Sequence, residues 1–120
     1  MAASHDLGRD AERAVADFLR SAGWAVLASN WRFGHKEIDL IVRRAGVVAF
    51  VEVKCRTAGR FGSPAEAVTA SKRRDLALAA KAWMGGAAPG AQSFRFDVCS
   101  VSVGAGGTFR IEHIEDAWRL

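Results

Sequence analysis

The chain has 120 residues, half of them hydrophobic and a quarter charged, with a formal net charge of +4. This length fits a single domain, residues 1–120, and the composition excludes a disordered chain. No apolar run reaches the roughly 20 residues of a membrane helix, and residues 1–6 lack the apolar core of a signal peptide. We therefore expect a cytoplasmic protein that does not bind membranes. Cys55 and Cys99 lack CxxC spacing, which argues against a cysteine zinc site and against a disulfide framework.

The first half of the chain predicts a helix followed by three strands. Apolar residues at helical spacing predict an amphipathic helix over residues 8–22, which Gly23 ends. Glu12 lies at the edge of its apolar stripe, so we expect Glu12 to face the sheet. Residues 24–27 predict a first strand and 30–34 a turn; residues 37–43 and 47–55 predict two further strands, with the second in a central position.

The second half predicts a helix and two more strands. Ser63-Pro64-Ala65-Glu66 has the pattern of a capped helix start, so a helix is expected from near Pro64, with a break at 69–71, to just before Gly85. Residues 94–103 predict a strand with a bulge near Val98, and residues 108–113 another strand after a glycine turn. Residues 115–118 are expected to form a short helical turn. The fold class is therefore α/β in the order αβββαββ, a central mixed sheet flanked by helices.

Two of the predicted strands carry an acid where a buried strand should carry none. Asp39 lies within Glu37-Ile38-Asp39-Leu40-Ile41, and Glu52 within Phe50-Val51-Glu52-Val53-Lys54. A carboxylate inside an apolar strand costs several kcal/mol unless a partner or a metal compensates it. Glu52 and Lys54 share one strand face, and an antiparallel neighbour would bring Asp39 beside them. Either acid alone fits an ordinary ion pair, whereas together they favour a site for a hard divalent ion, Mg²⁺ or Mn²⁺, with substrate phosphate oxygens completing its coordination.

The positive charge gathers after these strands and favours a polyanionic partner. The basic residues of this segment are Lys54, Arg56, Arg60, Lys72, Arg73, Arg74 and Lys81. Cations at the start of a helix oppose its dipole, so Lys72 and Arg73 are either a solvated helix start or contacts for an external anion.

An Asp on one strand and Glu-x-Lys on the next, within this order of elements, resembles the PD-(D/E)xK nuclease superfamily. A closer resemblance, to the YraN-like family of small bacterial proteins, covers residues 8–118. The matching segments are Gly8, Glu12, Ala14-Val15, Asn30-Trp31-Arg32, Glu37-Ile38-Asp39-Leu40-Ile41, Phe50-Val51-Glu52-Val53-Lys54-Cys55-Arg56, Phe61-Gly62, Lys72 and Arg95-Phe96-Asp97-Val98. The resemblance implies a restriction-endonuclease-like fold similar to that of Holliday-junction resolvases.

The resemblance also implies roles for particular residues. Asp39, Glu52 and the Val53 carbonyl would hold the metal, Lys54 would be the catalytic cation, and Glu12 would complete the site. The nucleic-acid-binding residues would be Arg56, Arg60, Lys72, Arg73 and Lys36. Lys36 stands where the family usually has a glycine, and it could add a phosphate contact or alter the local turn.

We therefore expect a metal-dependent DNA endonuclease, with branched DNA as the substrate and a homodimer as the assembly that the resemblance implies. Two alternatives remain open: a catalytically inactive nucleic-acid-binding protein with the same fold, and a DNA-repair or competence adaptor that binds a protein partner.

Overall fold

The computed structural model describes residues 3–56, 68–87, 91 and 93–119, with side chains from residue 8 onward except those of residues 56 and 87. Its helices are α1 (Ala3–Ser21) and α2 (Ala70–Ala87). Its strands are β1 (Ala25–Phe33), β2 (Lys36–Arg44), β3 (Val47–Arg56), β4 (Ser93–Val103) and β5 (Phe109–Trp118). The predicted order αβββαββ is confirmed. No helix in this described part of the chain has the length and apolar character needed to span a bilayer.

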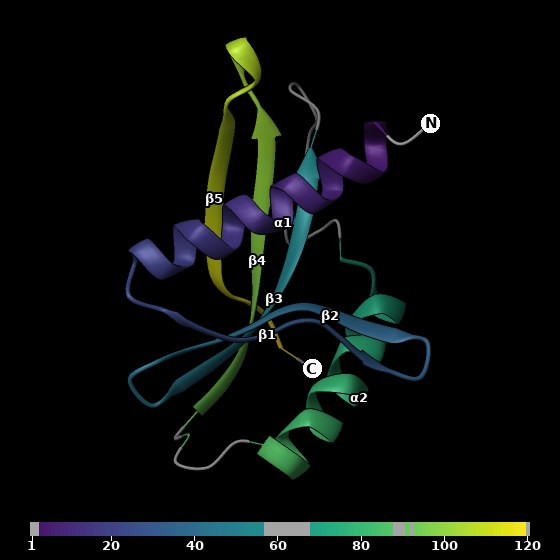
Figure 1. Cartoon of the computed structure of the whole chain (residues 1–120). Helices are drawn as coiled ribbons and strands as arrows, with labels where there is room; N and C mark the ends of the chain where they lie inside the picture. The colour runs from purple at the N-terminus through teal and green to yellow at the C-terminus, as the bar shows by residue number, and fades with distance from the viewer. Residues whose placement is uncertain (1–2, 57–67, 88–90, 92, 120) are drawn as a thin grey trace.

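The five strands form one mixed sheet in the order β1-β2-β3-β4-β5, with β3 in the centre as predicted. Only β3 and β4 are parallel, because α2 lies in the connection between them, whereas the other neighbours are antiparallel. α1 packs on β1, β3, β4 and β5, and α2 packs on β2 and β1 (Figure 1). Each helix covers its own buried hydrophobic cluster, so the architecture is the predicted α/β sheet flanked by helices.

The end of α1 follows directly from its sequence. Gly23 has a φ of +92°, which favours glycine because it has no Cβ. The Gly23 amide donates to the Arg20 carbonyl at 3.0 Å, and the Trp24 amide donates to the Leu19 carbonyl at 3.0 Å. This is a Schellman C-cap. Trp24 and Leu19 then bury their side chains in the same cluster, which fixes where α1 crosses the sheet.

The first hairpin is longer than predicted. The expected turn over residues 30–34 is wrong, because β1 continues to Phe33 and only Gly34 and His35 form the loop. Gly34 has a φ of +64° and Lys36 pairs with Phe33, so the tight turn needs its glycine at 34. The turn therefore does not need a glycine at position 36, where Lys36 is the first residue of β2.

The pairing of β4 with β5 is irregular where a bulge was predicted, but β5 carries the extra residues. Phe96 pairs with Trp118 and Val98 with Ile114, so residues 115–117 lie opposite Asp97. The expected helical turn over 115–118 is wrong, since this segment belongs to β5. The Asp116 backbone has a φ of +51° and its amide donates to an Asp97 carboxylate oxygen at 2.9 Å. A buried carboxylate thus stabilises the bulge.

The helix start predicted near Pro64 lies outside the described residues. From residue 68 onward, α2 begins at Ala70 with Thr69 as its N-cap, because the Lys72 amide donates to Thr69 Oγ1 at 3.2 Å. α2 also includes Gly85 and Gly86, which were expected to follow its end.

Candidate metal and nucleic-acid site

Glu52 is a charged side chain in the hydrophobic interior. It is 4% exposed and lies on the face of β3 that is covered by α2. Its Oε1 is buried and has no hydrogen-bond partner among the described residues. A buried acceptor without a partner costs roughly 1–3 kcal/mol, more if it is charged. The position therefore calls for a cation or a proton donor next to Glu52.

Asp39 lies beside Glu52 at the point where β2 and β3 separate. The β2–β3 pairing runs only from Leu40 opposite Val51 to Arg44 opposite Val47. Beyond it, the Val53 amide donates to Asp39 Oδ2 at 2.8 Å, so a side chain replaces the missing backbone partner. Burial, the contact with Glu52 and the charge of Glu52 raise the pKa of Asp39 to about 8. Two carboxyl groups thus share a poorly solvated site, and one of them holds a proton near neutral pH.

Glu12, on α1, lies close enough to Asp39 for their charges to interact. It accepts a hydrogen bond from Asn30 Nδ2 at 2.9 Å. Burial raises the pKa of Glu12, the Asn30 hydrogen bond opposes the rise, and the charges of Asp39 and Glu37 add to it. Asn30 reaches Glu12 from a left-handed backbone with φ +49°, a conformation that asparagine tolerates better than most residues. This contact gives a structural reason for the Asn30 of the sequence motif.

Lys72 forms an ion pair with Glu52, with Nζ 3.6 Å from Glu52 Oε2. Lys54 follows Glu52 by two residues on β3, is half-buried, and forms no ion pair with a described residue. The structure therefore brings a predicted DNA-contacting lysine next to a predicted metal ligand, and leaves the predicted catalytic lysine without a carboxylate partner in the described part of the chain.

The carboxylates can hold a metal only together with other ligands. Within the described residues, no group of three or more His, Cys, Asp and Glu side chains is arranged to hold a metal ion. In a strand, the amide and carbonyl of one residue point to the same edge, so the Val53 carbonyl lies on the same edge as its amide, toward Asp39. Two carboxylates and a carbonyl fit Mg²⁺, which keeps several water or phosphate ligands. The unpartnered Glu52 oxygen fits such an ion.

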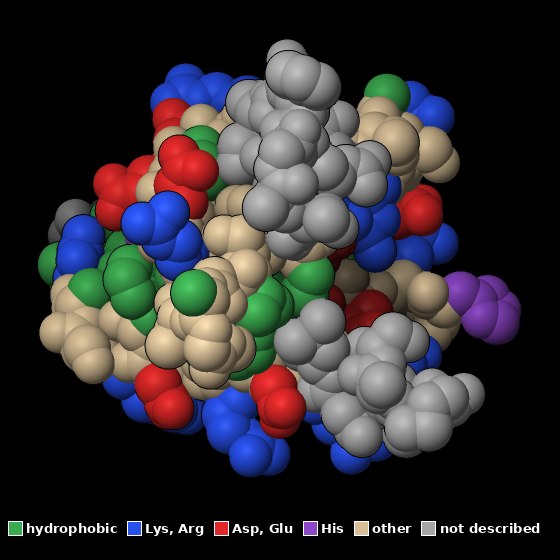
Figure 2. Space-filling view, turned by 90° about the horizontal axis from the view of Figure 1, so that it is seen from above, with side chains coloured by type: hydrophobic (Ala, Val, Ile, Leu, Met, Phe, Trp, Pro, Cys, Tyr) green, Lys and Arg blue, Asp and Glu red, His purple; other side chains and the backbone are tan. Residues whose placement is uncertain are grey.

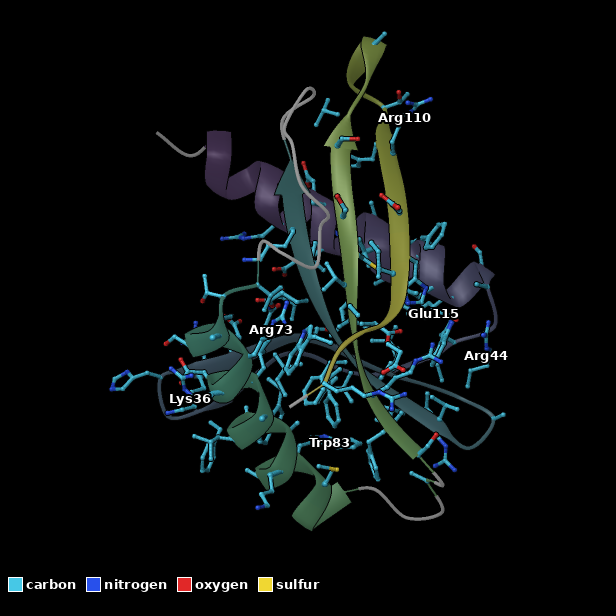
Figure 3. The ribbon with its side chains drawn as sticks, turned by 180° about the vertical axis from the view of Figure 1, so that it is seen from behind. Lys36, Arg44, Arg73, Trp83, Arg110 and Glu115 are labelled. Atoms are coloured by element: carbon cyan, nitrogen blue, oxygen red, sulfur yellow. The ribbon has the colours of Figure 1, made fainter. Side chains whose placement is uncertain are left out.

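The predicted nucleic-acid contacts are partly described. Lys36 lies near the turn end of the first hairpin, and Arg73 lies at the start of α2 (Figure 3). Arg73 Nε donates to the Val68 carbonyl at 2.9 Å, and its guanidinium lies 5.5 Å from the Trp118 ring. Arg60 and the Arg56 side chain lie outside the described residues. The space-filling view shows recessed acidic side chains with Lys and Arg side chains nearby (Figure 2).

A second buried acid, Asp97, has no place in this site. Its carboxylate accepts hydrogen bonds from Arg95 Nε at 3.0 Å and from the Asp116 amide at 2.9 Å, and it lies 2.7 Å from His113 Nε2. Although burial opposes it, these contacts together lower the pKa of Asp97. Asp97 is therefore a fully partnered structural carboxylate, unlike Glu52. His113 was uninformative in the sequence, because its partner is distant in the chain.

Sequence comparisons identify the family. The model for "Uncharacterised protein family UPF0102" matches residues 11–101. A UPF0102 protein of Symbiobacterium thermophilum is 42% identical over 115 residues, which cover 96% of this chain and 98% of the relative. A UPF0102 protein of Rhodococcus jostii is 40% identical over 98% of this chain and 100% of its own length. A third, from Nocardia farcinica, is 44% identical over 91% of this chain and 86% of its own length. This chain belongs to the UPF0102 family, the YraN-like family of the restriction-endonuclease-like superfamily, which confirms the resemblance.

Proposed function

We propose that this UPF0102 member is a metal-dependent nuclease that hydrolyses phosphodiester bonds in DNA. The observation that carries the proposal is the contact between Asp39 and Glu52, of which Glu52 is buried with an unpartnered oxygen. A structural ion pair would satisfy its buried atoms, as Asp97 does. The Asp39–Glu52 pair instead retains a proton and an open acceptor, which a divalent cation would replace and fill.

The residues of the chain have separate tasks in this proposal. Asp39, Glu52 and the Val53 carbonyl would hold Mg²⁺ or Mn²⁺. When bound, the ion supplies an activated water at neutral pH and stabilises the charge of the phosphate. Lys54, half-buried and without an ion pair to a described residue, is suited to neutralise a phosphate oxygen at this edge of the sheet. Glu12 and Asn30 would position water or the metal's outer ligands.

The test compares the native chain with Glu52→Gln. This change preserves the shape of the side chain and removes its charge, so the fold should remain. Labelled duplexes, flaps, single strands and four-way junctions are incubated with Mg²⁺ or Mn²⁺, and the chain is melted with and without Mn²⁺. We expect cleavage and Mn²⁺-dependent stabilisation from the native chain and neither from Glu52→Gln. Preferential cutting of junctions by a dimer would support the branched substrate and homodimer that the resemblance implies.

A nucleic-acid-binding protein without catalysis is the second candidate, and one observation favours it. Lys72 already lies 3.6 Å from Glu52 and supplies a positive charge without any metal. In that case Mn²⁺ would not stabilise the native chain, and DNA would bind equally well with and without EDTA. The melting experiment therefore separates the two functions, and the adaptor hypothesis would require that DNA does not bind at all.

A further inference from the structure

A groove of about 490 Å³ lies between α1 and β1, next to the carboxylate site. Glu12, Ser29, Asn30 and Leu40 contribute to its lining, and the charge of Glu12 acts on Asp39, so the groove reaches the neighbourhood of that carboxylate. The remaining lining residues come from one side of α1: Arg9, Arg13, Ala16, Asp17 and Arg20. None of these three arginines is among the residues that the sequence assigned to nucleic-acid binding.

The arginines are arranged along the groove. Arg9, Arg13 and Arg20 are separated by four and seven residues, which places them on one face of α1. At 1.5 Å of rise per residue, they extend over roughly 16 Å. One strand of a nucleic acid presents a phosphate about every 3.4 Å along a duplex axis, so this length corresponds to about five phosphates. The row therefore matches the length of a short backbone segment.

Three arginines outnumber the two acids that line the groove, Glu12 and Asp17. Asp17 pairs with Arg20 at 3.2 Å, but both side chains are more than half exposed, and such pairs contribute little. Glu12 accepts a hydrogen bond from Asn30 Nδ2 at 2.9 Å. Arg13 is exposed and forms no ion pair with a described residue. Arg13 and Arg20 therefore add positive charge to a polar groove in which arginines outnumber acids.

We propose that this groove binds the phosphodiester backbone of a single nucleic-acid strand and guides it to the carboxylates. The inference rests on the proposed function, because it names the path by which that substrate reaches the site. It adds a second basic surface on the α1 side of the sheet, opposite Lys72 and Arg73 on α2. A row of arginines along one side of a groove suits one strand, since a positively charged groove that follows the backbone is how single strands are bound without sequence preference.

The experiment measures binding of a labelled 12-nucleotide oligothymidine by fluorescence anisotropy in EDTA, over a range of salt concentrations. The variant combines Arg13→Ala with Arg20→Ala, changes that favour helix and should not unfold α1. The control combines Lys81→Ala with Arg110→Ala, which removes the same charge from exposed positions outside the groove. Arg110 lies at the start of β5, near the tip of the hairpin that β5 forms with β4 (Figure 3). Thermal melts verify that both variants fold.

Two lost phosphate contacts should lower the salt slope of log K by about 1.4 and the affinity roughly 25-fold at 0.1 M salt. The control should bind within about two-fold of the native chain. Equal losses in variant and control would overturn the groove, because net charge alone would then explain them. Native affinity in the variant, with binding lost on changing Lys72 and Arg73 to Ala, would also overturn it and leave the proposed nuclease intact. A native chain that binds no oligonucleotide or duplex would overturn both.

Discussion

The carboxylate pair makes a sharp prediction about stability, tested by Asp39→Asn. In the folded chain the pKa of Asp39 is raised to about 8, whereas its ordinary value is 3.8. Between these values the folded chain holds a proton at Asp39 that the unfolded chain has released. Stability therefore falls as pH rises through this window.

The magnitude follows from proton linkage. One extra proton in the folded state lowers the free energy of unfolding by about 1.4 kcal/mol for each pH unit. From pH 5 to pH 7 the loss is roughly 2.7 kcal/mol, which is about 10 °C in melting temperature for a chain of this size. Asparagine cannot ionise, yet its side-chain oxygen can still accept the hydrogen bond from the Val53 amide. Asp39→Asn should therefore lose this part of the slope and become more stable than the native chain near pH 8.

The assay is urea denaturation of both chains at pH 5, 6, 7 and 8 in EDTA, followed by circular dichroism. The difference between the slopes isolates Asp39, since the other titrating groups contribute similarly to both chains. Asp10→Asn makes the same chemical change at an exposed position of α1 and should retain the native slope. Parallel slopes for the native chain and Asp39→Asn, or a less stable Asp39→Asn at pH 8, would refute the shared proton.

Three further predictions concern other residues. Asp97→Asn should lower the free energy of unfolding by about 3 kcal/mol at pH 7, because it breaks a hydrogen-bonded ion pair whose carboxylate is fully buried. The pKa of Asp97 is lowered in the folded chain, so this contribution to stability should be lost on acidification below the ordinary pKa of an aspartate. Urea denaturation at both pH values checks this, and an unchanged midpoint at pH 7 would contradict the proposed structural role. In the native fold, a disulfide reagent should modify exposed Cys55 but not Cys99, which is buried and whose pKa burial raises to about 12. Burial and the charges of Glu12 and Asp39 raise the pKa of the Cys55 thiol, so Mg²⁺ bound beside Asp39 should accelerate the modification of Cys55. An unchanged rate of modification with Mg²⁺ would argue against metal binding beside Asp39. Gly23→Ala should cost about 1–2 kcal/mol through its left-handed backbone, as a melting curve will show, whereas Gly85→Ala in α2 should be neutral or stabilising.

Local signals in the sequence predicted most of the fold. Helical spacing and Gly23 gave the end of α1, and alternating apolar runs gave β2, β3 and β4. Two errors have a common cause. Asn30 has the left-handed backbone of a turn residue but lies within β1, and Asp116 has the same conformation within β5. In both places a carboxylate elsewhere in the chain holds the irregular strand, and single-sequence patterns do not contain such distant partners.

The candidate site was predictable to the extent that buried charge is visible in a sequence. Asp39 and Glu52 interrupt apolar runs, and the structure brings them together. The relation between the two lysines was not predictable. Strand periodicity links Lys54 to Glu52, whereas the contact of Lys72 with Glu52 depends on where α2 begins after a connection of more than ten residues. The position of the first residues of α2 in the folded chain thus decides that Lys72 pairs with Glu52.

The two roles considered for Lys72 are compatible because its present contact is weak. The side chain is 39% exposed, and an ion pair with one such partner is worth at most about 1 kcal/mol. Removing the Asp39 proton at pH 7 costs about 1.4 kcal/mol if its pKa is about 8. A divalent ion would therefore displace the Lys72 ammonium from Glu52 and the proton from Asp39 at a total cost of roughly 2 kcal/mol. Lys72 could then turn toward a phosphate. Metal affinity should then rise about ten-fold per pH unit up to pH 8, because each binding event releases one proton.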